Sequence, residues 1–217
     1  MTGVEVFVDP SCPWTWITSR WLTEVQAERN LSLTWRSFCI ELRDDYGVSP
    51  SVPEHLRAFA IEAHALSHRV LRIFEAVRAA SGEEAVDTLY AEWGRRFFVD
   101  TPRTDEALLG ESVEACDLDA DLLRAADDEA WDAPIVEAMK VAYAFGGPKT
   151  QTPVVVVGSD PAHGFKGPVM SPAPTGDAAL RLWDALDVVS REPGFFEITR
   201  PRANPPTPPT PPSDGRR

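Results

Sequence analysis

The chain has 217 residues, of which 43% are hydrophobic, and it carries a formal net charge of −13. This length and composition suffice for one globular domain of ordinary size, or for one domain with an insertion. The acidic balance excludes a surface built to bind nucleic-acid phosphates, and no apolar stretch reaches the roughly 18 residues that would span a membrane.

The N-terminal part has the pattern of a strand, a helix and a second strand. Val4–Val8 is a short β-rich run that ends in the loop signal Asp9–Ser11. Cys12 and Pro13 then open a helical pattern, and proline suits the first turn because its missing N–H would have no partner there anyway. Leu31–Phe38 alternates apolar and polar residues. We expect a β-α-β unit with parallel strands and a right-handed crossover.

The middle of the chain, residues 51–145, is helical throughout. Apolar residues recur at steps of three and four from Leu56 to Val77, and again from Val86 to Phe97. Shorter helical patterns cover Leu108–Cys116, Leu122–Ala126 and Trp131–Tyr143. We therefore predict an all-helical segment here.

Strand patterns return after the helical segment. Pro153–Val157 and Ala162–Phe165 are separated by the turn signal Gly158–Asp160, and a last helix is expected over Asp177–Ser190. The element order predicts an α/β domain with a helical insertion.

The domain bounds follow from this order. Residues 1–45 and 146–201 are expected to form the α/β domain, and residues 46–145 the helical insertion. The tail from Arg202 to Arg217 is rich in proline and has no apolar periodicity, so we expect it to be disordered or polyproline-like. A passive tail is preferred over a docking motif for a proline-binding partner.

Three widely spaced cysteines, Cys12, Cys39 and Cys116, give no Cys-x-x-Cys or Cys-x-x-His pair. Neither a disulfide framework nor a metal site is predicted. His64 and His68 are four residues apart on one helix, a spacing that can hold a metal, but without a third ligand we expect them to face solvent.

Cys12 is the candidate nucleophile. It lies in the polar turn between strand and helix, where the positive end of the helix dipole and free backbone N–H groups favour the thiolate. We therefore expect a lowered thiol pKa. A buried structural thiol is the alternative, and it remains the preferred interpretation for Cys39 and Cys116. A Cys12–Cys39 disulfide stays open.

The N-terminus passes straight into a strand without a basic segment or an apolar signal region. We therefore expect the protein to work in the reducing cytoplasm.

Several motifs together resemble the DsbA-like branch of the thioredoxin superfamily, and are similar to its actinobacterial group typified by mycothiol-dependent nitroreductase. The matching segments are Val8–Trp21, Gln151–Pro153, Phe165–Ser171, Leu182–Ala185 and Phe195–Glu197. The resemblance covers nearly the whole chain short of the tail. It implies a thioredoxin-like fold (β-α-β / β-β-α) with an inserted all-helical domain.

The resemblance also implies a site and a cosubstrate. Cys12 would be the catalytic nucleophile and mycothiol the low-molecular-weight thiol that serves it. Pro13 and Trp14 of the motif, Thr152 with a cis Pro153, and Gly167-Pro168-Val169 would line the thiol cleft. No metal is implied. The substrate would be a small molecule or a mixed disulfide; neither nucleic acid nor a membrane is an expected partner, and a homodimer is left open.

The chain departs from this family at Thr15, where the redox pattern Cys-Pro-Trp-Cys has its second cysteine. A hydroxyl cannot resolve a mixed disulfide at Cys12, so exchange must finish with an outside thiol. Thr15 can still hydrogen-bond the thiolate and is the second candidate catalytic residue. Arg96-Phe97-Phe98 stands near where the nitroreductase has a histidine, which puts nitro reduction in doubt. Pro168-Val169 disfavours glutathione.

Two other functions remain open. One is a transferase or isomerase resembling kappa-class glutathione transferase, in which Cys12 and Thr15 only orient a bound thiol. The other is a redox-inert binding or accessory protein that keeps only the fold.

Overall fold

The computed structural model describes residues 1–209 apart from Thr101 and Asp160. Four strands form one sheet in the order β2-β1-β3-β4. Their bounds are β1 Thr2–Val8, β2 Leu31–Ser37, β3 Val154–Val157 and β4 His163–Lys166. The α/β fold expected from the element order, which the family resemblance implied to be thioredoxin-like, is therefore confirmed.

The strand register brings three distant segments of the chain together at the same end of the sheet. β1 and β2 are parallel, whereas β3 runs antiparallel to β1 and to β4. Phe7 near the end of β1 is paired with Val154 at the start of β3, and Val154 with Lys166 at the end of β4. The residues that follow β1, precede β3 and follow β4 must therefore lie close together.

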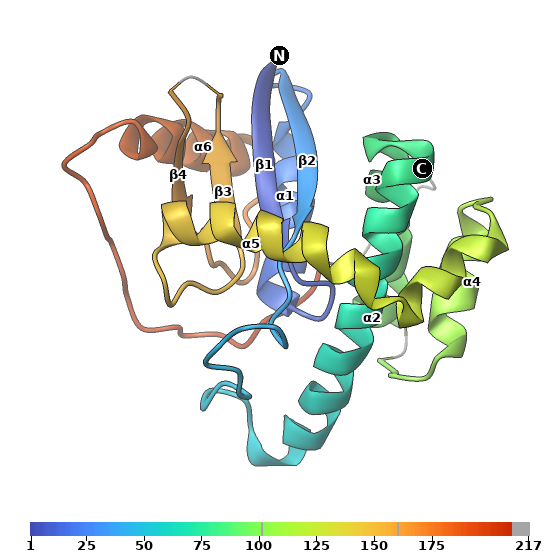
Figure 1. The fold of residues 1–217 in the computed structure, drawn as a ribbon. Helices are drawn as coiled ribbons and strands as arrows, with labels where there is room; N and C mark the ends of the chain where they lie inside the picture. The colour runs from blue at the N-terminus through green and yellow to red at the C-terminus, as the bar shows by residue number, and fades with distance from the viewer. Residues whose placement is uncertain (101, 160, 210–217) are drawn as a thin grey trace.

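Helices cover both faces of this sheet (Figure 1). α1 (Pro13–Val25) and α6 (Gly176–Ser190) pack together on one face, where the Trp21 indole N–H donates to the Ala179 carbonyl at 3.2 Å. α5 (Asp132–Gly146) crosses the other face. The four valines of β3 are all buried, so this strand belongs to the hydrophobic core.

The helical block lies beside the β2 edge in Figure 1 and falls between β2 and β3 in the chain. Its helices are α2 Arg57–Ser81, α3 Glu83–Gly94 and α4 Ala107–Ala115. A π-helical turn, Arg95–Asp100, continues α3. Three 3-10 turns, Glu54–Leu56, Ala120–Asp127 and Glu129–Trp131, complete it. The pattern at Leu122–Ala126, expected to be α-helical, is 3-10.

Within the described ranges, no helix has both the length and the apolar character needed to cross a membrane. The bounds of the two predicted domains remain predictions. Of the tail, residues 202–209 are described and residues 210–217 lie outside the described part of the chain.

Candidate active site

The loop between β1 and α1 is organised by the fully buried carboxylate of Asp9. Its Oδ1 accepts hydrogen bonds from the Ser11 amide (2.8 Å), the Ser11 hydroxyl (2.6 Å) and the Ser67 hydroxyl of α2 (2.6 Å). Its Oδ2 accepts from the Ile40 amide at 2.8 Å. The Cys12 amide donates to the Asp9 carbonyl at 2.9 Å. One side chain thus connects the loop that presents Cys12 to the end of β2 and to the helical block.

We expect Asp9→Asn to lower the free energy of unfolding by about 2–3 kcal/mol, because an amide group turns one acceptor into a donor facing buried N–H or O–H donors. Asp44→Asn is the matched control, because Asp44 is exposed and its substitution should change stability by less than about 0.5 kcal/mol. Urea unfolding of both variants measures the difference. Equal stabilities would show that Asp9 does not organise the loop.

Cys12 is the N-cap residue of α1, with extended backbone angles, and Pro13 occupies the first helical turn. Cys12 is buried, with an exposed fraction of 7%. The Sγ atom donates to the backbone carbonyl of Thr152 at 3.9 Å. The thiol therefore lies between the start of α1 and the segment that enters β3, as the sheet register requires.

Opposing effects act on the pKa of Cys12. Burial raises it, because a thiolate is poorly solvated there, while the Thr15 and Thr152 side chains and the Thr15 amide lower it. The Oγ1 atoms of both threonines are buried and have no other hydrogen-bond partner among the described residues, so either hydroxyl can donate to the Cys12 sulfur. The balance in this structure is a raised pKa. The expected lowered pKa is therefore wrong, because burial of the Cys12 thiol outweighs the effects that favour the thiolate.

The opposite side of the site is formed by the segments before β3 and after β4. The Thr152–Pro153 and Gly167–Pro168 peptide bonds are both cis. The Gly167 amide donates to the Pro153 carbonyl at 2.8 Å, and the Thr18 hydroxyl of α1 donates to the Pro168 carbonyl at 2.8 Å. Gly167 has φ +106°, a conformation that favours glycine. The predicted cleft residues of these two segments thus adjoin the Cys12 helix.

Two further predicted cleft residues are more exposed. Val169 is 36% exposed, and Trp14 is half-buried. The guanidinium of Arg202 lies over the Trp14 ring, 4.8 Å from its centroid. A ligand that stacks on Trp14 would therefore have to share or displace this contact.

An aromatic layer supports α1 just behind the motif. Trp16 stacks on Phe98 of the π-helical turn, with ring centroids 5.8 Å apart, and Trp93 stacks on Phe97 at 5.5 Å. The Trp93 indole N–H donates to the Pro10 carbonyl at 3.0 Å. The helical block therefore holds both the loop before Cys12 and the helix after it.

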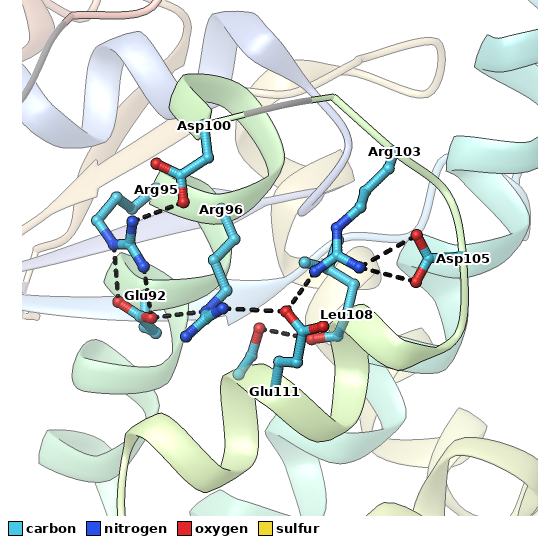
Figure 2. Close-up of polar contacts among 9 residues, drawn as sticks. Glu92, Arg95, Arg96, Asp100, Arg103, Asp105, Leu108 and Glu111 are labelled. Carbon is cyan, nitrogen blue, oxygen red and sulfur yellow. Dashed lines mark hydrogen bonds and ion pairs between the residues drawn. The ribbon is translucent and has the colours of Figure 1, made fainter.

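An ion-pair network keeps the π-helical turn against α4 (Figure 2). Glu92 accepts from Arg95 at 2.8 Å and from Arg96 at 2.7 Å, and Arg96 also reaches Glu111 at 3.0 Å. Glu111 is paired with Arg103 as well. Arg96 is therefore occupied in this network, while the neighbouring phenylalanines pack toward the motif.

Cys39, Cys116 and His68 are all at least partly buried. Cys12, Cys39 and Cys116 are all free thiols; Cys39 is fully buried and Cys116 is half-buried. Burial raises the pKa of Cys116 to about 11. His68, expected to face solvent, is instead 12% exposed in its side chain and contacts Glu41 at 3.0 Å and Asp132 at 2.7 Å. In the described part of the chain no cluster of three or more His, Cys, Asp and Glu side chains could hold a metal.

Three residues at the site, Asp9, Ser67 and Arg202, were not predicted from the sequence. Asp9 stands in an Asp-Pro pair that signals only a loop, although a carboxylate directly after a buried strand end was a signal that it needs partners. Nothing local in the sequence connects Ser67 or Arg202 to the motif.

The model of the Rv2466c-like family, described as mycothiol-dependent nitroreductase Rv2466c, matches residues 11–200. The uncharacterized protein Rv2286c of Mycobacterium tuberculosis is 25% identical over 215 residues, an alignment that covers 94% of this chain and 84% of that protein.

Solved structures share the fold. The probable DsbA oxidoreductase SCO1869 from Streptomyces coelicolor gives a TM-score of 0.61 at 17% identity, covering 97% of this chain and all of that one. The cytosolic disulfide reductase DsbM from Pseudomonas aeruginosa gives 0.58 at 14% identity, covering 86% and 99%.

Proposed function

Because the chain belongs to the Rv2466c-like family, that of mycothiol-dependent nitroreductase Rv2466c, we propose that it is a monothiol thiol-disulfide oxidoreductase that works in the cytoplasm with mycothiol as its thiol cosubstrate. Cys12 is its nucleophile. Thr15 takes the place of a resolving cysteine, so the reaction depends on an outside thiol.

The observation that carries this proposal is the setting of the Cys12 sulfur. Sγ lies 3.9 Å from the Thr152 carbonyl, and the Thr15 and Thr152 hydroxyls next to it are buried and have no other partner among the described residues. Unused buried donors are costly unless a ligand or a charge uses them. A thiolate on Cys12, or the sulfur of a thiol bound beside it, would accept both hydrogen bonds.

The reaction follows from this arrangement. The Cys12 thiolate attacks one sulfur of a substrate disulfide, forms a mixed disulfide with that half, and releases the other half as a thiolate. The Thr15 hydroxyl stabilises Cys12 as a thiolate before the attack and when it leaves again. The mixed disulfide is then cleaved by external thiol, which returns Cys12 to its reduced form and carries away the oxidising equivalents as a new disulfide.

The residues that would hold the thiol partner surround Cys12. Thr152 and cis Pro153 offer backbone groups to its sulfur-bearing arm, Gly167-Pro168-Val169 lines the neighbouring side, and Pro13 and Trp14 complete the wall. DsbM, which shares the fold, has been solved with GSH, so a low-molecular-weight thiol is compatible with this architecture.

The test is adduct formation with oxidised mycothiol, followed by intact mass and peptide mapping. We expect one mycothiol on Cys12, no adduct in Cys12→Ser, and an unchanged adduct in Cys116→Ser. Because burial raises the pKa of the Cys12 thiol, the reactive thiolate fraction should increase as pH rises. The rate should therefore still climb above the ordinary thiol value of about 8.5 rather than level off below it.

Other outcomes would reject the proposal in different ways. If the folded wild-type protein forms no adduct and the Cys12→Ser variant keeps the catalytic turnover of wild type, Cys12 only orients a bound thiol, as in a transferase or isomerase. No thiol binding at all would leave a redox-inert binding protein.

A further inference from the structure

The described part of the C-terminal tail does not extend freely from the domain. After α6 the chain loops out past β4 and returns below the sheet (Figure 1). There the Arg202 guanidinium lies over Trp14, 4.8 Å from the ring centroid. Trp14 belongs to the active-site motif, only two residues beyond Cys12.

The tail has a second anchor on the other side of the site, at Ser171 in the loop that follows Gly167-Pro168-Val169. The Asn204 side-chain amide donates to the Ser171 carbonyl at 3.0 Å, and the Ser171 hydroxyl donates to the Pro205 carbonyl at 2.7 Å. The Thr207 amide donates to the Ser171 hydroxyl at 3.0 Å. One serine therefore makes three contacts with a short stretch of tail.

The two anchors belong to opposite walls of the proposed thiol cleft. Arg202 contacts the wall carried by α1, and Asn204 contacts the wall carried by the loop after β4. Two residues of extended chain span about 7 Å, so the segment bridges from one wall to the other. Cys12, which is 7% exposed, lies at the start of α1 on the first of these walls.

The composition of residues 202–207 favours a bridge between these two walls. Pro205 and Pro206 fix backbone angles, which lowers the entropy lost when the segment is ordered on a surface. The flat guanidinium of Arg202 matches the face of an indole, the aromatic ring that attracts cations most strongly. The chain as a whole carries a net charge of −13, so a cationic side chain is also favoured on its surface.

We propose that Trp14 and Ser171 form a binding surface for an extended segment that contains arginine and proline, and that the chain's own residues Arg202–Thr207 occupy it as a strap over the active site. The strap must leave Trp14 before a bulky thiol or disulfide can reach Cys12. This last step rests on the proposed function, whereas the binding surface does not.

The experiment compares Arg202→Ala with Arg200→Ala in the full-length protein. Both substitutions remove one arginine from the segment that follows α6, but Arg200 makes no hydrogen bond, ion pair or aromatic contact with the described residues. The readout is the rate at which a bulky maleimide labels Cys12, followed by peptide mapping so that Cys39 and Cys116 do not contribute. We expect Arg202→Ala to label about two to five times faster than wild type, and Arg200→Ala to match wild type.

A second variant, Ser171→Ala, removes the two hydroxyl contacts of the other anchor and should also accelerate labelling, with the double variant Arg202→Ala/Ser171→Ala faster than either. Equal rates for Arg202→Ala, Arg200→Ala and wild type would overturn the strap. Maleimide labelling needs no mycothiol, so a failure of the proposed thiol chemistry would leave this result interpretable, and a failure of the strap would leave the adduct test untouched.

Discussion

A Thr15→Cys variant is expected to release a thiol bound to Cys12 without help from a second external thiol. Thr15 is fully buried in the first turn of α1, three residues after Cys12, and its side chain is close enough to lower the pKa of Cys12. A new thiol there would attack the Cys12 sulfur of the mixed disulfide, form an intramolecular disulfide with it, and expel the bound thiol as a thiolate.

The expected effect is large because the attack becomes intramolecular. A neighbouring thiol acts at an effective concentration of at least the millimolar order, so at micromolar external thiol the adduct should disappear about a thousandfold faster than in wild type. Quenched-flow alkylation and intact mass measure its lifetime. Thr15→Ser is the control, since it keeps a hydroxyl beside Cys12 and should leave the adduct as long-lived as in wild type.

A folded Thr15→Cys protein whose adduct persists would contradict the arrangement, because the side chain at position 15 would then not reach the sulfur. It would also remove the physical basis for Thr15 as the hydroxyl that stabilises the thiolate. This outcome differs from a failure of the adduct to form at all, which would count against Cys12 as a nucleophile.

Apolar periodicity was enough to predict the strands and the longer helices of this fold, although Leu122–Ala126 is 3-10 rather than α-helical. The alternation in β2 and the three- and four-residue steps in α2 reflect surfaces that must be buried, and such surfaces are local properties of the sequence. The role of Cys12 stays a prediction: its place in a strand-to-helix turn is a local property of the sequence, whereas its burial is not. The other cleft residues came only from family resemblance, because a Thr-Pro or Gly-Pro pair carries little information by itself.

What the sequence could not predict depends on contacts between distant residues. The burial that raises the pKa of Cys12 is created by segments far away in the chain, including the one that ends at Thr152. The hydrogen bonds of Asp9 need Ser67 and the loop at Ile40. The contact between Arg202 and Trp14 joins the two ends of the chain, while the proline-rich composition of the tail indicates only that it cannot form a core.

We expect Gly94→Ala to lower the free energy of unfolding by about 3 kcal/mol, a large effect for the addition of one methyl group. A Cβ atom at Gly94 would lie 2.1 Å from Cζ3 of Trp16. The Trp16 ring cannot move away easily, because it is 3% exposed, stacks on Phe98 at 5.8 Å and meets the edge of Tyr90 at 5.7 Å.

Gly110→Ala is the matched control in α4, because no atom lies within 4 Å of the added Cβ. It should raise stability by about 0.5–1 kcal/mol, as alanine is the better helix former. Urea unfolding measures both variants, and equal changes in the free energy of unfolding would show that α1 and α3 do not meet as closely as described.

Because Trp16 is one turn after Cys12, the displacement forced on the Trp16 ring would also move the start of α1. We therefore expect Gly94→Ala, and not Gly110→Ala, to slow adduct formation at Cys12 under conditions where both proteins remain folded.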